Sequence, residues 1–335
     1  MSSRIELYQN SIKKFTSSNS VVQHHKYKQL IFGIMDTHDF IVPISLLTIM
    51  NGQTRKNKFD SVSGYDMALG IELLLFMLEY DEHIHGITKN TIFDNFREHD
   101  FMQLLLLSNI NQLMCQNMKQ IFNLNYKSDN NVKNNVVWCI EKINAEIPTI
   151  VEYFNNISNN VHNKIGAKLI KKTDLKHFNF SNPTYLNDIR TFRKVRKDLI
   201  ISYTTNTYCK IISIALMCGW IFGGGSVDMV MNLERLGYHF GILLKISNDF
   251  TNIEKDIKNV CEQKYTFNYV VNHGLQDAFE LFDECKKKFF EGVLTLNILS
   301  PTIKEIISMF DNNVSNVIEH SSPDLKQSLS STSSF

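Results

Sequence analysis

Three polar side chains stand four residues apart near position 250. They are Asn248, Asn252 and Asp256, and in an α-helix this spacing stacks them on one face, one turn above the next. The segment before them, Leu233 to Ile246, is too apolar for a surface helix. Oxygen-bearing side chains in such a row suit a hard cation such as Mg²⁺. A polar stack at the end of a buried helix needs a partner, because unsatisfied buried polar groups are costly.

A second cluster of potential ligands follows the apolar run 71–80. Asp81 and Glu82 precede His85 by four and three residues, so a helix places all three on one face. Two such clusters at the ends of apolar helices predict a facing pair that binds a diphosphate through several Mg²⁺ ions. The metals would act as Lewis acids on the departing diphosphate, in a cavity otherwise lined by apolar and aromatic side chains. In the alternative interpretation, both clusters are solvated helix ends.

The elements that would position these clusters are helices. The chain has 335 residues, 43% of them hydrophobic and only five of them proline, and it lacks the alternation typical of strands. We expect an all-α protein, a single large helical bundle around a central cavity over residues 1–320, followed by a disordered serine-rich tail at 321–335. The glycines at 223–225 should end one helix, and Ser226 should begin the next. The expected helices are 3–33, 40–51, 65–86, 91–125, 132–157, 183–203, 206–222, 226–258, 274–292 and 300–320, with a loop at 159–182.

Composition argues against several classes of partner. The net charge of +1 predicts no strong field toward nucleic acid. No apolar run approaches the ~18 residues of a membrane span, and the N-terminus has no apolar signal core. The six cysteines are scattered without a Cys-x-x-Cys pair, which is typical of reduced thiols in a reducing compartment.

The order and spacing of these segments resemble the trans-isoprenyl diphosphate synthases and the related class I terpene synthases, and viral trans-prenyltransferases look especially similar. The resemblance is carried by residues 217–224, 233–241, 247–250 and 267–274, the last of which is similar to an Asn-Tyr element of polyprenyl synthetases. It implies the isoprenoid synthase fold, a prenyl diphosphate substrate, three bridging Mg²⁺ ions and a homodimer. It also implies a cytoplasmic location, in the host cytoplasm if the protein is viral.

The same resemblance assigns roles to residues. Metal would be bound by Asp81, Glu82 and His85 on one wall and by Asn248, Asn252 and Asp256 on the other, with Asp81 and Asn248 the principal catalytic groups. A diphosphate-sensing arginine, as in class I terpene synthases, would be Arg193 or Arg196, and Lys255 would also reach the diphosphate. The alternative for the two arginines is a solvated basic face. Asp249 and Glu254 point elsewhere and are expected to form salt bridges.

Departures from the family pattern bear on the reaction. Each Asp-Asp-x-x-Asp motif is altered, to Asp-Glu-His-Ile-His at 81–85 and to Asn-Asp-Phe-Thr-Asn at 248–252. The Lys and Arg of the basic clamp for isopentenyl diphosphate correspond to Asp39 and Val42, and a later Lys-Thr pair corresponds to Asn206 and Thr207. Each lost charge-assisted hydrogen bond is worth roughly 1.5–3 kcal/mol, so the site for a second diphosphate would be weakened by orders of magnitude.

One allylic diphosphate could still ionise without a partner, because the stack is similar to the terpene synthase pattern Asn-Asp-x-x-Ser/Thr-x-x-x-Glu. The leading hypothesis is therefore a Mg²⁺-dependent, terpene synthase-like enzyme acting on farnesyl or geranylgeranyl diphosphate. One alternative is a divergent trans-prenyltransferase, with Lys26, Lys28, Arg55 or Lys56 replacing the clamp. The other is a catalytically silent subunit that pairs with an active synthase.

Overall fold

The computed structural model describes residues 3–18, 39–57, 64–84, 96–124, 130–164, 195–260 and 266–319. All regular elements within these ranges are helical, so the predicted all-α bundle is confirmed. The predicted tail at 321–335 lies outside the described residues. In chain order the elements are α1 (Arg4–Ser18), α3 (Ile41–Asn57), α4 (Tyr65–Ile84), α5 (Phe96–Leu124), α6 (Asn130–Lys164), α7 (Lys197–Thr204), η5 (Thr205–Cys209), α8 (Lys210–Phe222), η6 (Val227–Met229), α9 (Val230–Thr251), α10 (Ile253–Val260), α11 (Tyr269–His273), α12 (Leu275–Thr295) and α13 (Pro301–Ile318).

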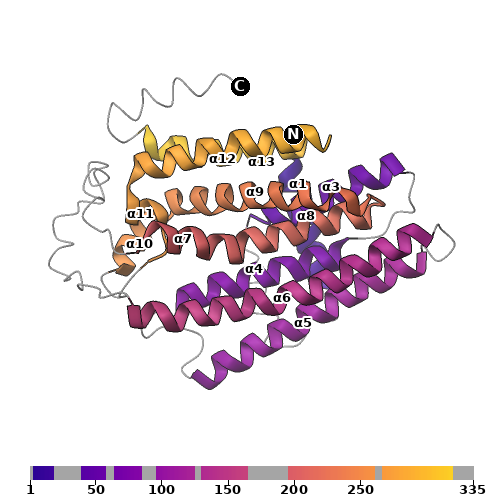
Figure 1. The fold of residues 1–335 in the computed structure, drawn as a ribbon, viewed down its shortest axis with the longest axis horizontal. Coiled ribbons are helices and arrows are strands. Elements are labelled where there is room, and N and C mark those ends of the chain that lie inside the picture. The colour runs from indigo at the N-terminus through magenta and orange to yellow at the C-terminus, as the bar shows by residue number, and fades with distance from the viewer. Residues whose placement is uncertain are drawn as a thin grey trace.

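Helices α8 and α9 form the centre of the bundle. From Ile214 to Phe222 every residue of α8 is buried, as expected for a helix that is apolar on all sides. Helix α3 packs on one flank of α8 and α9 on another, while α12 and α13 cover α9. Figure 1 shows α12 and α13 along one edge of the bundle, with α5 and α6 along the opposite edge. Burial of these apolar side chains supplies the main driving force for the fold.

Two glycines let α9 lie against η5 and α8 at very short range. A Cβ atom on Gly241 would come 2.7 Å from the Cα atom of Cys209, and one on Gly237 would come 2.6 Å from the Cα atom of Ser213. No other residue fits without moving the backbone. The two glycines therefore fix how close α9 sits to its neighbours, and so where the C-terminal end of α9 emerges from the core.

The glycine stop after α8 is as predicted. Gly223 follows the last helical residue, and Gly224 has φ of 88°, in the left-handed region that glycine tolerates. The Ser226 hydroxyl then accepts the backbone N–H of Asp228 at 3.2 Å and begins η6. The chain reverses here, which makes α8 and α9 antiparallel neighbours.

Several predicted boundaries are wrong. The helix predicted at 206–222 is continuous with α7 through η5, a single π-helical turn, because one extra residue there widens the turn without breaking the helix. Residues 159–164, predicted as loop, belong to α6. The helix predicted at 183–203 does not include 195 and 196, which precede α7. Helix 226–258 is interrupted at Asn252, and the short α11 was not predicted.

Candidate active site

The stack of Asn248, Asn252 and Asp256 runs along one continuous helical path. Asn252 has φ of −101° and ψ of 9°, which ends α9, yet α10 resumes at the next residue. The backbone N–H of Asn252 bonds the carbonyl of Asn248 at 3.0 Å, and that of Asp256 bonds the carbonyl of Asn252 at 2.9 Å. The i, i+4 pattern thus survives the interruption, and the three side chains share one face, each half-buried.

Asp256, the one carboxylate in the stack, is held by a residue that the sequence did not single out as part of the site. The Nδ2 atom of Asn268 donates to Oδ2 of Asp256 at 2.7 Å and to the backbone carbonyl of Asp249 at 2.8 Å. Asn268 also begins α11, because its Oδ1 atom accepts the backbone N–H of Val271 at 3.0 Å. The only sequence signal for this residue was the Asn-Tyr element at 268–269.

Asp249 is buried in the last turn of α9 and joins this helix to the start of α11. Its Oδ1 atom pairs with Nζ of Lys245 at 2.5 Å, and its Oδ2 atom accepts the backbone N–H of Tyr269 at 2.7 Å. The predicted salt bridges of Asp249 and Glu254 are both confirmed, the latter with Lys258. Burial raises the pKa of Asp249 to about 7, although Lys245 and the Tyr269 N–H both act to lower it.

The first predicted cluster lies in the last turn of α4 and beyond it. Asp81 and Glu82 are helical residues of α4, although their side chains lie outside the described part of the structure, as does the whole of His85. Figure 1 shows the C-terminal ends of α4 and α9 at the same end of the bundle, on the left of the view, with α10 and α11.

The structure describes two of the three basic residues that are predicted to contact the diphosphate. Arg193 lies outside the described residues. Arg196 is exposed, immediately before α7, where it forms a two-pronged ion pair with Asp198 that raises the pKa of the arginine and lowers that of the aspartate. Lys255 is exposed on α10, next to Asp256. The roles of these three residues toward a diphosphate stay predictions.

The positions that correspond to the basic clamp carry no positive charge, and one of them lies in the core. Asp39 is exposed just before α3, whereas Val42 is 2% exposed and part of the core. The amide of Asn206 donates to the Ser202 carbonyl at 2.8 Å, and the Thr207 hydroxyl donates to the Tyr203 carbonyl at 2.6 Å. Both of these η5 side chains are therefore engaged by their own helix.

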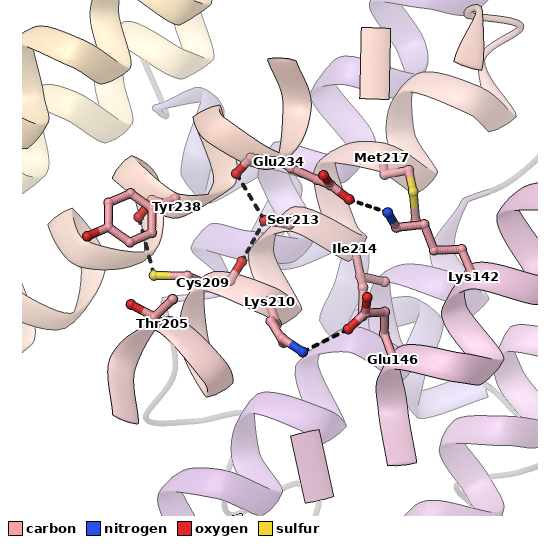
Figure 2. Close-up of a pocket in the computed structure, with 10 residues that line it drawn as sticks. All are labelled: Lys142, Glu146, Thr205, Cys209, Lys210, Ser213, Ile214, Met217, Glu234 and Tyr238. Atoms are coloured by element: carbon pink, nitrogen blue, oxygen red, sulfur yellow. Dashed lines mark hydrogen bonds and ion pairs between the residues drawn. The ribbon is translucent and has the colours of Figure 1, made fainter. Parts of the chain in front are cut away.

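A pocket of about 200 Å³ lies between α6, η5, α8 and α9 (Figure 2). Ile214 and Met217 contribute apolar lining. Ion pairs tie α6 to the other walls, Lys142 to Glu234 of α9 and Lys210 of α8 to Glu146, the latter at 3.0 Å. Neither the stack of Asn248 nor Arg196 lines this pocket. It is thus separate from the predicted metal-binding face.

The candidate metal ligands on the α9–α10 face are of the chemical type that Mg²⁺ prefers. They are two amide oxygens and one carboxylate, all hard oxygen ligands. Nδ2 of Asn252 donates to the Asn248 carbonyl at 2.9 Å, which turns the amide oxygen away from that carbonyl. Within the described ranges no three His, Cys, Asp or Glu side chains are grouped as a complete metal site. Ligands from the end of α4 would be needed to complete the coordination.

Comparison with known proteins supports the fold. A geranyltransferase from Helicobacter pylori 26695 matches over 94% of this chain and 99% of its own, with a TM-score of 0.51 and 12% identity. A geranyltransferase from Legionella pneumophila matches over 93% and 94%, with a TM-score of 0.48 and 12% identity. A geranylgeranyl pyrophosphate synthase matches over 98% and 96%, with a TM-score of 0.46 and 10% identity. No protein-family model and no curated protein matches the sequence.

The chain therefore has the all-α fold of the trans-isoprenyl diphosphate synthases. The predicted resemblance to that superfamily is confirmed at the level of fold, and nothing in these matches bears on the likeness to viral trans-prenyltransferases. The five cysteines within the described ranges are free thiols, as predicted. No helix in those ranges combines the length and apolar character needed to cross a membrane.

Proposed function

We propose that this chain is a Mg²⁺-dependent enzyme of the trans-prenyltransferase type that acts on a prenyl diphosphate. The observation that carries the proposal is the intact stack of Asn248, Asn252 and Asp256 at the end of a buried helix, in a chain with the fold of prenyl diphosphate synthases. The end of α4, where Asp81 and Glu82 lie, is at the same end of the bundle. We also propose that the protein forms a homodimer, as the resemblance to the trans-isoprenyl diphosphate synthases implies.

The proposed roles follow from the chemistry of each group. Asn248, Asn252 and Asp256 would hold Mg²⁺ on one wall, and Asp81, Glu82 and His85 would hold it on the other. Bound Mg²⁺ supplies Lewis-acid neutralisation of charge on the departing diphosphate. Arg193, Arg196 and Lys255 would orient the diphosphate by charge-assisted hydrogen bonds. Asn268 keeps the Asp256 carboxylate in one orientation.

A chain-elongating enzyme also needs a site for isopentenyl diphosphate, and here a substitute for the clamp is required. Arg55 and Lys56 in the last turn of α3 are exposed and supply two positive charges on the helix that begins at the clamp position. Because α3 and α4 run in opposite directions, the end of α3 lies away from the end of α4, where Asp81 and Glu82 are placed (Figure 1), so these two charges do not replace the clamp. Both residues are also roughly four turns of helix from Val42, so a second diphosphate bound there would lie far from the clamp position.

A terpene synthase-like reaction is the second candidate, and one observation favours it. Val42 is buried in the core and Asp39 carries a negative charge, so the clamp position itself repels a second diphosphate. Such an enzyme would ionise farnesyl or geranylgeranyl diphosphate alone and release a cyclised or linear terpene. The engaged amide of Asn206 supports the same candidate, since no cation stands there.

One experiment separates the candidates. Purified protein is incubated with Mg²⁺ and geranyl, farnesyl or geranylgeranyl diphosphate, with and without isopentenyl diphosphate, and the products are analysed by mass spectrometry. A longer prenyl diphosphate that forms only with isopentenyl diphosphate supports the prenyltransferase. A hydrocarbon or alcohol formed without it supports the terpene synthase-like enzyme. No product in any mixture, with the Asp256→Asn variant indistinguishable from the parent protein, would leave only the silent subunit.

A further inference from the structure

Asn268 makes more contacts with the candidate site than a residue that only begins a short helix requires. It is 1% exposed, and both polar atoms of its side-chain amide form hydrogen bonds. The oxygen accepts the Val271 N–H, while the nitrogen donates both to the Asp249 carbonyl and to Oδ2 of Asp256. Three interactions in different directions leave the amide a single orientation.

The anchoring of α11 does not depend on the bond to Asp256. The Asp249 carboxylate already holds the start of α11 through the Tyr269 N–H. The side chain of Asn272 joins the same segment to the residues just before α7, since its Oδ1 atom accepts the Val195 N–H at 3.0 Å, and its Nδ2 atom donates to the Thr266 carbonyl at 2.7 Å. The hydrogen bond from Asn268 to Asp256 is thus not needed to hold α11 in place, and its effect is on the Asp256 carboxylate.

That bond leaves Asp256 with unequal oxygen atoms. Oδ2 is occupied by the Asn268 amide at 2.7 Å, and among the hydrogen bonds of the described residues none involves Oδ1. A carboxylate held in this way can offer a cation one oxygen readily, whereas binding through both oxygens requires loss of the amide bond. Mg²⁺ takes carboxylates through one oxygen in a strict octahedral arrangement, whereas Ca²⁺ accepts two-oxygen carboxylates and more ligands.

We propose that Asn268 is a positioning residue that restricts Asp256 to one-oxygen coordination and so makes the site select Mg²⁺ over Ca²⁺. The inference deepens the proposed function and rests on its assignment of Asp256 as a metal ligand. Asn268 acts through Asp256 and does not itself touch metal or substrate. Loss of such an orienting partner typically costs 10- to 100-fold in metal affinity.

The test uses the full chain and Mn²⁺ as the probe, followed by electron paramagnetic resonance, with Mg²⁺ or Ca²⁺ as competitor. Asn268→Ser is the informative variant, because serine can still begin α11 but cannot reach Asp256. Asn272→Ala is the matched control, because it removes hydrogen bonds from the same segment and leaves Asp256 in place. Asp256→Asn and the double variant Asp256→Asn/Asn268→Ser complete a thermodynamic cycle.

We expect both single variants in the 266–273 segment to lower the melting temperature. Asn268→Ser alone should weaken Mn²⁺ and Mg²⁺ binding about 10-fold and raise the relative affinity for Ca²⁺ by a similar factor. In the Asp256→Asn background the Asn268→Ser change should have no further effect on metal binding. A metal preference that is unchanged in Asn268→Ser, or equally changed in Asn272→Ala, would overturn the positioning role.

The failure of the proposed function gives a different result. If the unmodified protein binds Mn²⁺ no more tightly than Asp256→Asn, then Asp256 is not a metal ligand, and both the metal site and the role of Asn268 are rejected. If the unmodified protein binds Mn²⁺ more tightly than Asp256→Asn while Asn268→Ser matches the unmodified protein, only the role of Asn268 is rejected.

Discussion

Lys245 and Asp249 lie one turn apart on α9 and form a buried ion pair, with 2.5 Å between Nζ and Oδ1 and side chains that are 7% and 4% exposed. The Lys245 ammonium also donates to the Phe267 carbonyl at 3.4 Å. Desolvation makes such pairs poor sources of net stability. Because Lys245 reaches Phe267 and Asp249 reaches Tyr269, the pair fastens α9 to the segment that carries Asn268.

The pH dependence of stability should report on Asp249. Its pKa is about 7 in the folded protein and near 3.8 when the carboxyl is exposed in the unfolded chain, so the folded state holds the proton more tightly. The contribution of this group to the free energy of unfolding is greatest below about pH 4 and declines as the pH rises through 7. Urea denaturation at intervals from pH 5 to pH 8 should show this decline in the parent protein and its loss in Asp249→Asn.

The comparison between the two proteins at each pH removes the contribution of other titrating groups. Asp249→Asn should be less stable overall, because the amide has one acceptor oxygen and cannot accept from both the Lys245 ammonium and the Tyr269 N–H. The gap between the two proteins should narrow with rising pH. A gap that stays constant from pH 5 to pH 8 would mean that Asp249 is ionised throughout and that its pKa is not raised.

The contact between Gly241 and Cys209 should tolerate no side chain. In Gly241→Ala the new Cβ atom would meet the Cys209 backbone, so α9 would have to move, at a cost of about 1–3 kcal/mol in the free energy of unfolding. Gly52→Ala is the matched control, since no atom lies within 4 Å of its Cβ position and alanine should stabilise α3 by about 0.5–1 kcal/mol. Equal effects of the two changes in urea denaturation would contradict this packing.

The sequence predicted the helical fold and the stacking of Asn248, Asn252 and Asp256 on one face, because both depend on local patterns. Apolar helices and the spacing of Asn248, Asn252 and Asp256 are visible within a few turns of chain. The contact of Asn268 with Asp256 is not, since it depends on how the chain returns after α10. The sequence predicts a salt bridge for Asp249, but it does not show that the partner is Lys245 or that the pair is buried in the core.

Insertions of a single residue are equally hidden from pattern analysis. The π-helical turn at 205–209 carries no glycine or proline, and its sequence is compatible with an ordinary helix. The sequence therefore predicts a boundary between two helices where the structure has one continuous helix. The family resemblance offers Arg196 as a diphosphate-sensing residue, and only the structure shows the pairing of its guanidinium with Asp198, two residues later.

The missing clamp should resist simple restoration. Val42→Arg would bury a guanidinium in the core and is expected to cost roughly 3–5 kcal/mol in the free energy of unfolding. Asp39→Lys, at an exposed position three residues earlier, should change it by no more than about 0.5 kcal/mol. Chemical denaturation measures both. A stable, well-folded Val42→Arg protein would show that this position can open to solvent, and would weaken the argument against isopentenyl diphosphate binding there.

Thiol reactivity should follow burial. Cys115 is exposed on α5, whereas Cys139, Cys209, Cys218 and Cys285 are buried. Burial raises the pKa of Cys285 to about 12 and that of Cys209 further, so few of these groups are present as the reactive thiolate. The number of thiols that react rapidly with a chromogenic disulfide is measured in the native parent protein and in each variant. Cys115→Ser should have one rapidly reacting thiol fewer than the parent protein, and Cys285→Ser should have the same number as the parent.

Denaturation in guanidinium supplies the control for this thiol experiment, because every cysteine that remains should then react rapidly. Loss of the rapid native reaction in Cys285→Ser would show that α12 separates from α9 on the time scale of the measurement. That outcome would mean that α12 is among the parts of the molecule that open most easily. The polar face at the end of α9 would then be less rigid than its hydrogen bonds suggest.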